Sequence, residues 1–147
     1  MSIRIAELCL TALICLTICG CGPKTPERAK TYPVIGKLTV DGEAPGSAIQ
    51  VYCHPVDGMD PKFPTVSECV TNEDGTFQIS TYLAGDGVPA GEYILTFEWK
   101  EFNLLSRGYG GPDKLKKKYS DKEKSPYRIT VEPGQQLDLG TLDLTTK

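Results

Sequence analysis

The sequence predicts an all-β protein, a seven-stranded β-sandwich. Two observations indicate it. Beyond residue 33 hydrophobic residues alternate with polar ones with a period of two, as in strands that bury one face. The chain also contains 15 Gly and 11 Pro among 147 residues, which favours many short strands joined by turns. This length provides one domain with a proper core. A small β-barrel is the minority alternative.

Seven segments carry the strand pattern, with turn residues between them. They are residues 34–40, 49–53, 65–71, 77–80, 93–99, 129–131 and 137–144. The pattern is strongest over 93–99, where the bulky residues at odd positions run from Tyr93 to Trp99. Asp41-Gly42 and the run NEDG at 72–75 mark two of the turns.

Two local features refine this strand assignment. In the last segment Leu137 and Leu139 share one parity, and Leu142 and Leu144 share the other. This change of parity predicts a β-bulge near Gly140, where no side chain resists the kink. Residues 113–119 are the one stretch of the domain with a helical pattern, for barely two turns.

The N-terminal segment differs from the rest of the chain. Residues 8–18 are almost wholly apolar, a run too short to cross a bilayer of roughly 30 Å and typical of a helical signal peptide. An uncleaved anchor or a buried helix is the alternative. Ile18, Gly20 and Cys21 resemble the lipobox of bacterial lipoproteins, whereas Cys19 fits badly because Ile18 precedes it. The resemblance implies cleavage before Cys21, acylation of its thiol with palmitate-like chains, and attachment to a membrane.

The predicted organisation therefore has three parts. Residues 1–20 are the lipoprotein signal peptide, 21–32 a flexible polar tether, and 33–147 the β-domain. The expected location is extracytoplasmic, anchored by the N-terminal lipid. Gly22 is not the aspartate that retains enterobacterial lipoproteins at the inner membrane, so the outer membrane or the periplasmic face is favoured.

Four segments resemble those of small bacterial lipoproteins with a transthyretin-like (prealbumin-like), carboxypeptidase-regulatory-like domain. The segments are VIGKLTVDG (34–42), TNEDGTF (71–77), STYLAGDGVPAGEY (80–93) and YSDKEKSPYRITV (119–131). The resemblance implies a Greek-key sandwich on the cell envelope. It implies no catalytic residues and no cofactor.

Cys53 and Cys69 lie on neighbouring predicted strands, in a compartment where disulfides persist. We predict that they form a disulfide; two small buried thiols are the alternative. His54 is the sole histidine, and neighbours on a strand point to opposite faces, so Cys53, His54 and Cys69 do not predict a metal site. No histidine base lies near Ser106, Ser120 or Ser125, and the sequence predicts no enzyme.

The loop 103–111 is the candidate binding segment. Leu104, Leu105 and Tyr109 offer apolar contact, and Arg107 offers a fork-shaped charge. The sequence favours a simpler interpretation, in which the segment is a strand connection whose leucines cover one open end of the core. A net charge of -3, with no concentrated basic face, argues against nucleic acid as a partner.

These features predict a non-catalytic cell-envelope lipoprotein, a module for binding a protein partner or building the cell surface. A sandwich that binds a glycan or small ligand is the alternative. An exposed row of aromatic residues, from the set Tyr82, Tyr93 and Trp99, would favour that alternative, and a buried row would count against it.

Overall fold

The computed structural model describes residues 27–147, and within this range every regular element is a β-strand. The strands are β1 (Thr31–Tyr32), β2 (Val34–Val40), β3 (Gln50–Pro55), β4 (Ser67–Val70), β5 (Thr76–Gln78), β6 (Val88–Pro89), β7 (Gly91–Glu98), β8 (Glu101–Asn103), β9 (Gly108–Gly110), β10 (Arg128–Val131) and β11 (Leu137–Leu144). The predicted signal peptide and Cys21 lie outside the described residues. Within residues 27–147 no helix is long and apolar enough to cross a membrane.

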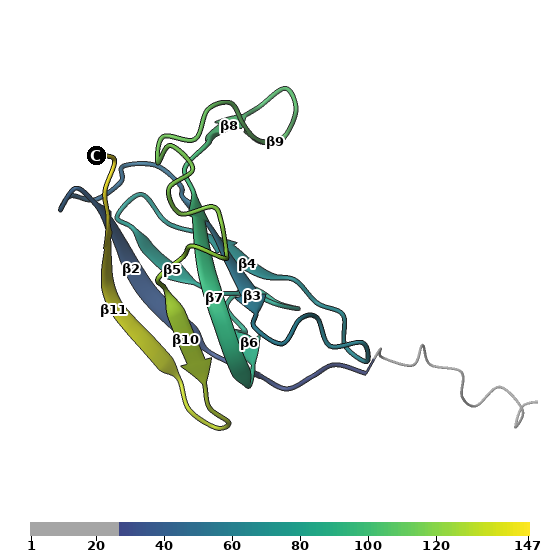
Figure 1. Cartoon of the computed structure of the whole chain (residues 1–147). Helices are drawn as coiled ribbons and strands as arrows, with labels where there is room; N and C mark the ends of the chain where they lie inside the picture. Colours follow the sequence, from purple (N-terminus) through teal and green to yellow (C-terminus); the bar gives the residue numbers. More distant parts are fainter. Residues whose placement is uncertain (1–26) are drawn as a thin grey trace, which may run out of the picture.

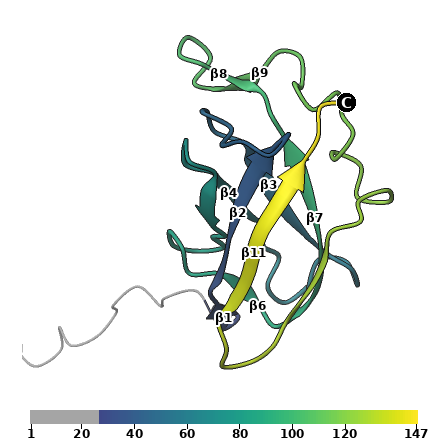
Figure 2. The same cartoon turned by 90° about the vertical axis from the view of Figure 1, so that its left-hand side faces the viewer.

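Two larger sheets form the body of the domain (Figure 1 and Figure 2). One has four strands in the order β10-β7-β3-β4, and the other has three in the order β11-β2-β5. All pairs are antiparallel except β11 and β2, which run parallel. A single cluster of buried side chains takes residues from both sheets. The protein is thus all-β, in an arrangement compatible with a β-sandwich.

The predicted alternation is confirmed in the strands that build this core. Leu38 on β2, Val51 on β3 and Leu95 on β7 are completely buried. Strand β7 buries more of its residues than the alternating pattern predicts. Thr96, which points to the opposite face from Leu95, is 2% exposed, so this central strand is buried on both faces.

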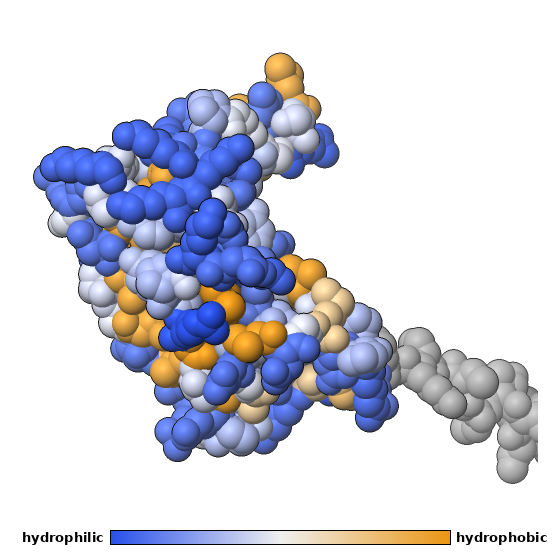
Figure 3. Space-filling model, viewed as in Figure 1, coloured by the Kyte–Doolittle hydropathy of each residue, from blue (hydrophilic) through white to orange (hydrophobic). Residues whose placement is uncertain are grey.

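Two short ribbons lie outside the larger sheets. Strand β1 pairs with β6, through Thr31↔Pro89 and Tyr32↔Val88. Residues 31 and 32 belong to the segment expected to be a flexible tether; here they are paired with the domain, because Tyr32 packs against the core. Strands β8 and β9 form a hairpin that projects from the body of the molecule (Figure 1 and Figure 3).

The bulge predicted near Gly140 is confirmed. The pairing of β11 with β2 shifts register between Asp138 and Thr141, and Gly140 adopts a φ of 63°. Glycine reaches this left-handed conformation without the steric cost that a Cβ imposes. The bulge lets leucines of both parities pack against the core.

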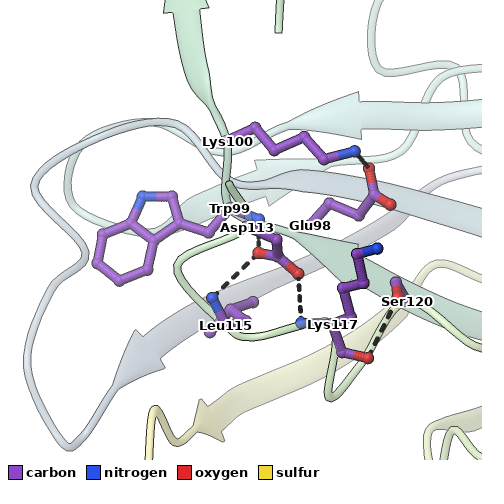
Figure 4. A network of polar contacts seen from close by, with 7 residues as sticks. All are labelled: Glu98, Trp99, Lys100, Asp113, Leu115, Lys117 and Ser120. Atoms are coloured by element: carbon purple, nitrogen blue, oxygen red, sulfur yellow. Dashed lines mark hydrogen bonds and ion pairs between the residues drawn. The ribbon is translucent and has the colours of Figure 1, made fainter. Parts of the chain in front are cut away.

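The short helix expected over residues 113–119 is wrong: this segment is a series of turns. The Asp113 carboxylate accepts hydrogen bonds from the backbone N–H groups of Trp99, at 2.9 Å, Leu115, at 3.0 Å, and Lys117, at 2.9 Å (Figure 4). Lys116 and Lys117 have positive φ angles of 56° and 61°, which a right-handed helix excludes. The side chain of Asp113 therefore organises the loop and ties it to the end of β7.

Candidate functional site

The hairpin β8–β9 contains all four residues that the sequence indicated for binding. Its strands pair through Glu101↔Gly110, Phe102↔Tyr109 and Asn103↔Gly108, and residues 104–107 form the tip. In the larger sheets and ribbons of the described structure, β8 and β9 pair only with each other. The hairpin is therefore a separate projection that the end of β7 carries.

Interactions within the hairpin hold its shape. The side-chain oxygen of Asn103 accepts hydrogen bonds from the N–H groups of Leu105, at 2.8 Å, and Ser106, at 3.2 Å. Arg107 takes a left-handed φ of 51° and completes the turn. Behind the tip the rings of Phe102 and Tyr109 pack edge to face, with their centroids 5.2 Å apart.

The two leucines at the tip are among the most exposed hydrophobic residues of the described chain. Leu104 is 83% exposed and Leu105 is 97% exposed. The interpretation in which they cover the open end of the core is wrong, because the hairpin carries them away from it. Leu115 and Tyr119, from the loop after the hairpin, belong to the core cluster. The surface at the end of the projection is accordingly hydrophobic (Figure 3).

A second feature, a groove with a volume of about 470 Å³, was not predicted from the sequence. We call it the tyrosine groove. Its lining comes from β3, β4, the loop after Ile79 and the hairpin, and comprises Gln50, Tyr52, Val66, Glu68, Cys69, Val70, Ser80, Thr81, Tyr82, Leu83, Ala84 and Tyr109. Gln50 and Tyr52 point away from the face of β3 that carries Val51 and Cys53. In the sequence, the groove could have been indicated only by Gln50 and Tyr52, which are polar and aromatic residues at alternate positions of a predicted strand.

The loop that borders the tyrosine groove has a defined shape. The two oxygens of the Asp86 carboxylate accept hydrogen bonds from the N–H groups of Thr81, Tyr82 and Leu83, at 2.7, 3.0 and 3.1 Å. Gly87 follows with a φ of 84°, and a Cβ on it would lie 1.8 Å from the carbonyl oxygen of Tyr32. The close approach and the positive φ explain why position 87 is a glycine.

Cys53 and Cys69 are both free thiols in the structure, contrary to the predicted disulfide. The strand register gives the reason. Cys53 lies opposite Ser67, and Cys69 lies opposite Val51, so the two cysteines are diagonal neighbours. Diagonal positions separate the Cα atoms by about 7–8 Å, beyond the usual span of a disulfide. Burial raises the pKa of both thiols, that of Cys69 to about 12.

His54 has a structural partner. Its Nε2 lies 2.8 Å from the hydroxyl oxygen of Thr96 on β7. Burial, and then the charge of Lys122, lower the pKa of the imidazole below its usual value. Cys53 is buried while His54 is half-buried, in keeping with their opposite faces. No group of three or more metal-binding side chains occurs among residues 27–147.

Two of the serines weighed as nucleophiles, and the turn aspartate Asp74, make local hydrogen bonds. The hydroxyl of Ser125 donates to the carbonyl oxygen of Leu95 at 2.5 Å, and that of Ser120 donates to Lys117 at 3.2 Å. Asp74 accepts from the backbone N–H of Thr76 at 2.9 Å, as turn aspartates do.

Comparison with known proteins assigns no family. No protein-family model and no curated protein matches the chain. Among solved structures, the chain is similar to a 9R-lipoxygenase from Cyanothece PCC8801, with 18% identity and a TM-score of 0.37. The similarity covers 82% of this chain and 18% of that chain. A TM-score of this size carries no argument about fold or activity.

The free thiols lead to a test by alkylation. In the folded protein we expect slow modification of Cys53 and Cys69 at pH 7.5, because a raised pKa leaves little reactive thiolate. After denaturation without reductant both should react fully, as peptide mass analysis would show. If neither cysteine were modified under those conditions, the two would be bridged after all.

Proposed function

We propose that this chain is a lipid-anchored module of the cell envelope that has no catalytic site and binds a protein partner through the tip of the β8–β9 hairpin. In this proposal Cys21 carries the lipid, no cofactor is needed, and the outer membrane or periplasmic face is the favoured location. The exposure of Leu104 and Leu105 on a projecting hairpin is the observation that carries it.

The tip has the properties of a protein-binding site. Loops held by a rigid scaffold are frequent sites of recognition, and clustered exposed hydrophobic residues mark contact surfaces. Burial of each leucine against a partner would contribute roughly 1.5–3 kcal/mol. The contacts of Asn103 and the Phe102–Tyr109 ring pair hold the hairpin in shape before binding. Such preorganisation lowers the entropic cost of association.

The direction of the hairpin also supports a partner that lies away from the anchoring membrane. The chain enters the domain through β1 at one end, and the β8–β9 hairpin lies at the opposite end (Figure 2). An anchor on Cys21 would be connected to the domain at the β1 end. The hydrophobic tip would then face away from the lipid surface.

For the fold we propose a transthyretin-like, seven-stranded Greek-key sandwich. The four-stranded and three-stranded sheets, with a shared core cluster, support this proposal. The β1–β6 and β8–β9 ribbons are then additions at the two ends.

The aromatic row considered for glycan binding gives that alternative no support. Tyr93 is 6% exposed and belongs to the core cluster. The indole N–H of Trp99 donates to the hydroxyl of Ser47 at 2.8 Å, and the ammonium of Lys114 lies 5.1 Å from the ring centroid. Tyr82 and Trp99 are half-buried, so the three residues do not form an exposed row.

The lipid anchor is tested by metabolic labelling with a palmitate analogue in cells that produce the full chain. We expect labelled protein whose intact mass corresponds to cleavage before Cys21 plus the acyl chains. Cys21→Ser should abolish the label, and the matched variant Cys19→Ser should keep it. A labelled species that retains residues 1–20, or loss of the label in Cys19→Ser alone, would contradict the proposal.

The docking role is tested by in-cell photo-crosslinking from position Ser106, next to the leucine pair. We expect one dominant protein product, weakened at least about tenfold by the double variant Leu104→Ser/Leu105→Ser, because the apolar contact is lost. The thermal midpoint should stay unchanged, since both side chains are exposed.

Met59, 54% exposed on another loop, provides the matched control. Met59→Ser should leave the product unchanged. Equal crosslinking in the double variant and the unaltered chain, or a product that contains only lipid, would refute the proposal.

A further inference from the structure

The tyrosine groove contains a buried polar group with no partner. Gln50 is 3% exposed, and both its side-chain oxygen and its side-chain nitrogen lack a hydrogen bond within the described part of the chain. An unpaired buried amide is costly, because the group has lost its hydrogen bonds to water. Such a group calls for an explanation, and a ligand that completes its hydrogen bonds is one.

The groove also contains rings that can stack. Tyr52, Tyr82 and Tyr109 line it from three separate segments of the chain. The guanidinium of Arg28 lies over the ring of Tyr82, 5.1 Å from its centroid, so that one face of this ring is covered. Tyr52 and Tyr109 remain as platforms for the apolar face of a ligand.

The charge of the lining restricts the ligand. Glu68 lines the groove, and the pKa of Tyr52 is raised, first by burial and then by the charges of Glu98 and Glu68. The Lys100 ammonium lies 2.6 Å from a carboxylate oxygen of Glu98, so these two charges offset each other. Glu68 is the one charged residue among the lining residues, and its carboxylate disfavours an anionic ligand.

An extended peptide does not fit the groove as an added strand. Strand β4 is the edge of its sheet. Its outward-facing backbone groups at Glu68 are already bonded: the N–H donates to the Ser80 carbonyl at 3.0 Å, and the carbonyl accepts from Ser80 at 3.1 Å. Strand addition needs free groups at this position. The bonded groups at Glu68 block strand addition at this position, which favours a ligand that interacts with side chains.

We propose that the tyrosine groove binds a neutral oligosaccharide, with the Gln50 amide paired to two adjacent hydroxyls and the sugar ring stacked on Tyr52 or Tyr109. A hydroxyl both donates and accepts, so two neighbouring hydroxyls satisfy the oxygen and the nitrogen of one amide. The site is distinct from the leucines at the hairpin tip. The amide atoms are covered in the ligand-free structure, so the sugar must displace a neighbouring side chain of the lining to reach them.

The proposal is tested by NMR titration of the full chain with three neutral sugars, cellotriose, maltotriose and triacetylchitotriose. The readout is the side-chain NH₂ resonance of Gln50, assigned by its absence in Gln50→Met. At least one sugar should shift this resonance in a saturable way, and Gln50→Met should weaken binding at least tenfold. The same variant should raise the thermal midpoint of the ligand-free protein, because it removes an unpaired buried amide.

Two controls keep the test decisive. Gln135→Met, at an exposed position, should change neither binding nor the thermal midpoint. Leu104→Ser/Leu105→Ser should keep sugar binding, which separates this site from the protein-docking proposal. No shift with any of the three sugars, a lowered thermal midpoint in Gln50→Met, or a saturable shift with a neutral peptide instead would overturn the proposal.

Discussion

The structure depends most on strand β7, which is held on both edges and buried on both faces. Along one edge it pairs with β3, from Gln50↔Glu98 to Pro55↔Tyr93. Along the other it pairs with β10 and then with the loop before it, where the N–H of Leu95 donates to Tyr127 at 2.9 Å. The side chains from Tyr93 to Phe97 are all buried, as in a strand covered on both faces. Its position therefore constrains the elements around it.

Both candidate sites take their geometry from this strand. The hairpin begins at Glu101, separated by two residues from the end of β7 at Glu98, and Asp113 ties the return segment to the N–H of Trp99. The tyrosine groove uses the outward side chains of β3, whose register against β7 places Tyr52 opposite Thr96. A rigid central strand thus presents a hydrophobic tip and positions the polar floor of the groove.

Local sequence patterns predicted the structural features that depend on residues close together in the chain. The alternation located β2, β3 and β7, and the parity change among the C-terminal leucines located the bulge at Gly140.

The remaining features depend on contacts between residues far apart in the sequence. Residues 113–119 have a helical pattern but form turns, because the Asp113 carboxylate accepts a hydrogen bond from the N–H of Trp99, 14 residues earlier in the chain. Strand β11 runs parallel to β2, a pairing between the two ends of the domain that no local pattern encodes. The loop 103–111 was singled out by composition, but its exposure follows only from the hairpin pairing. The groove likewise combines four separate segments.

Amide hydrogen exchange of the full domain tests the central role of β7 most directly. The account predicts that the N–H groups of Leu95 and Phe97 exchange slowest, through global unfolding, while those of the hairpin tip 104–107 exchange at least about 100-fold faster through local opening. That result would distinguish a rigid central strand from the exposed recognition element that it carries. Exchange of Leu95 and Phe97 as fast as that of the tip would contradict it, because β7 could not then be the element that positions the two sites.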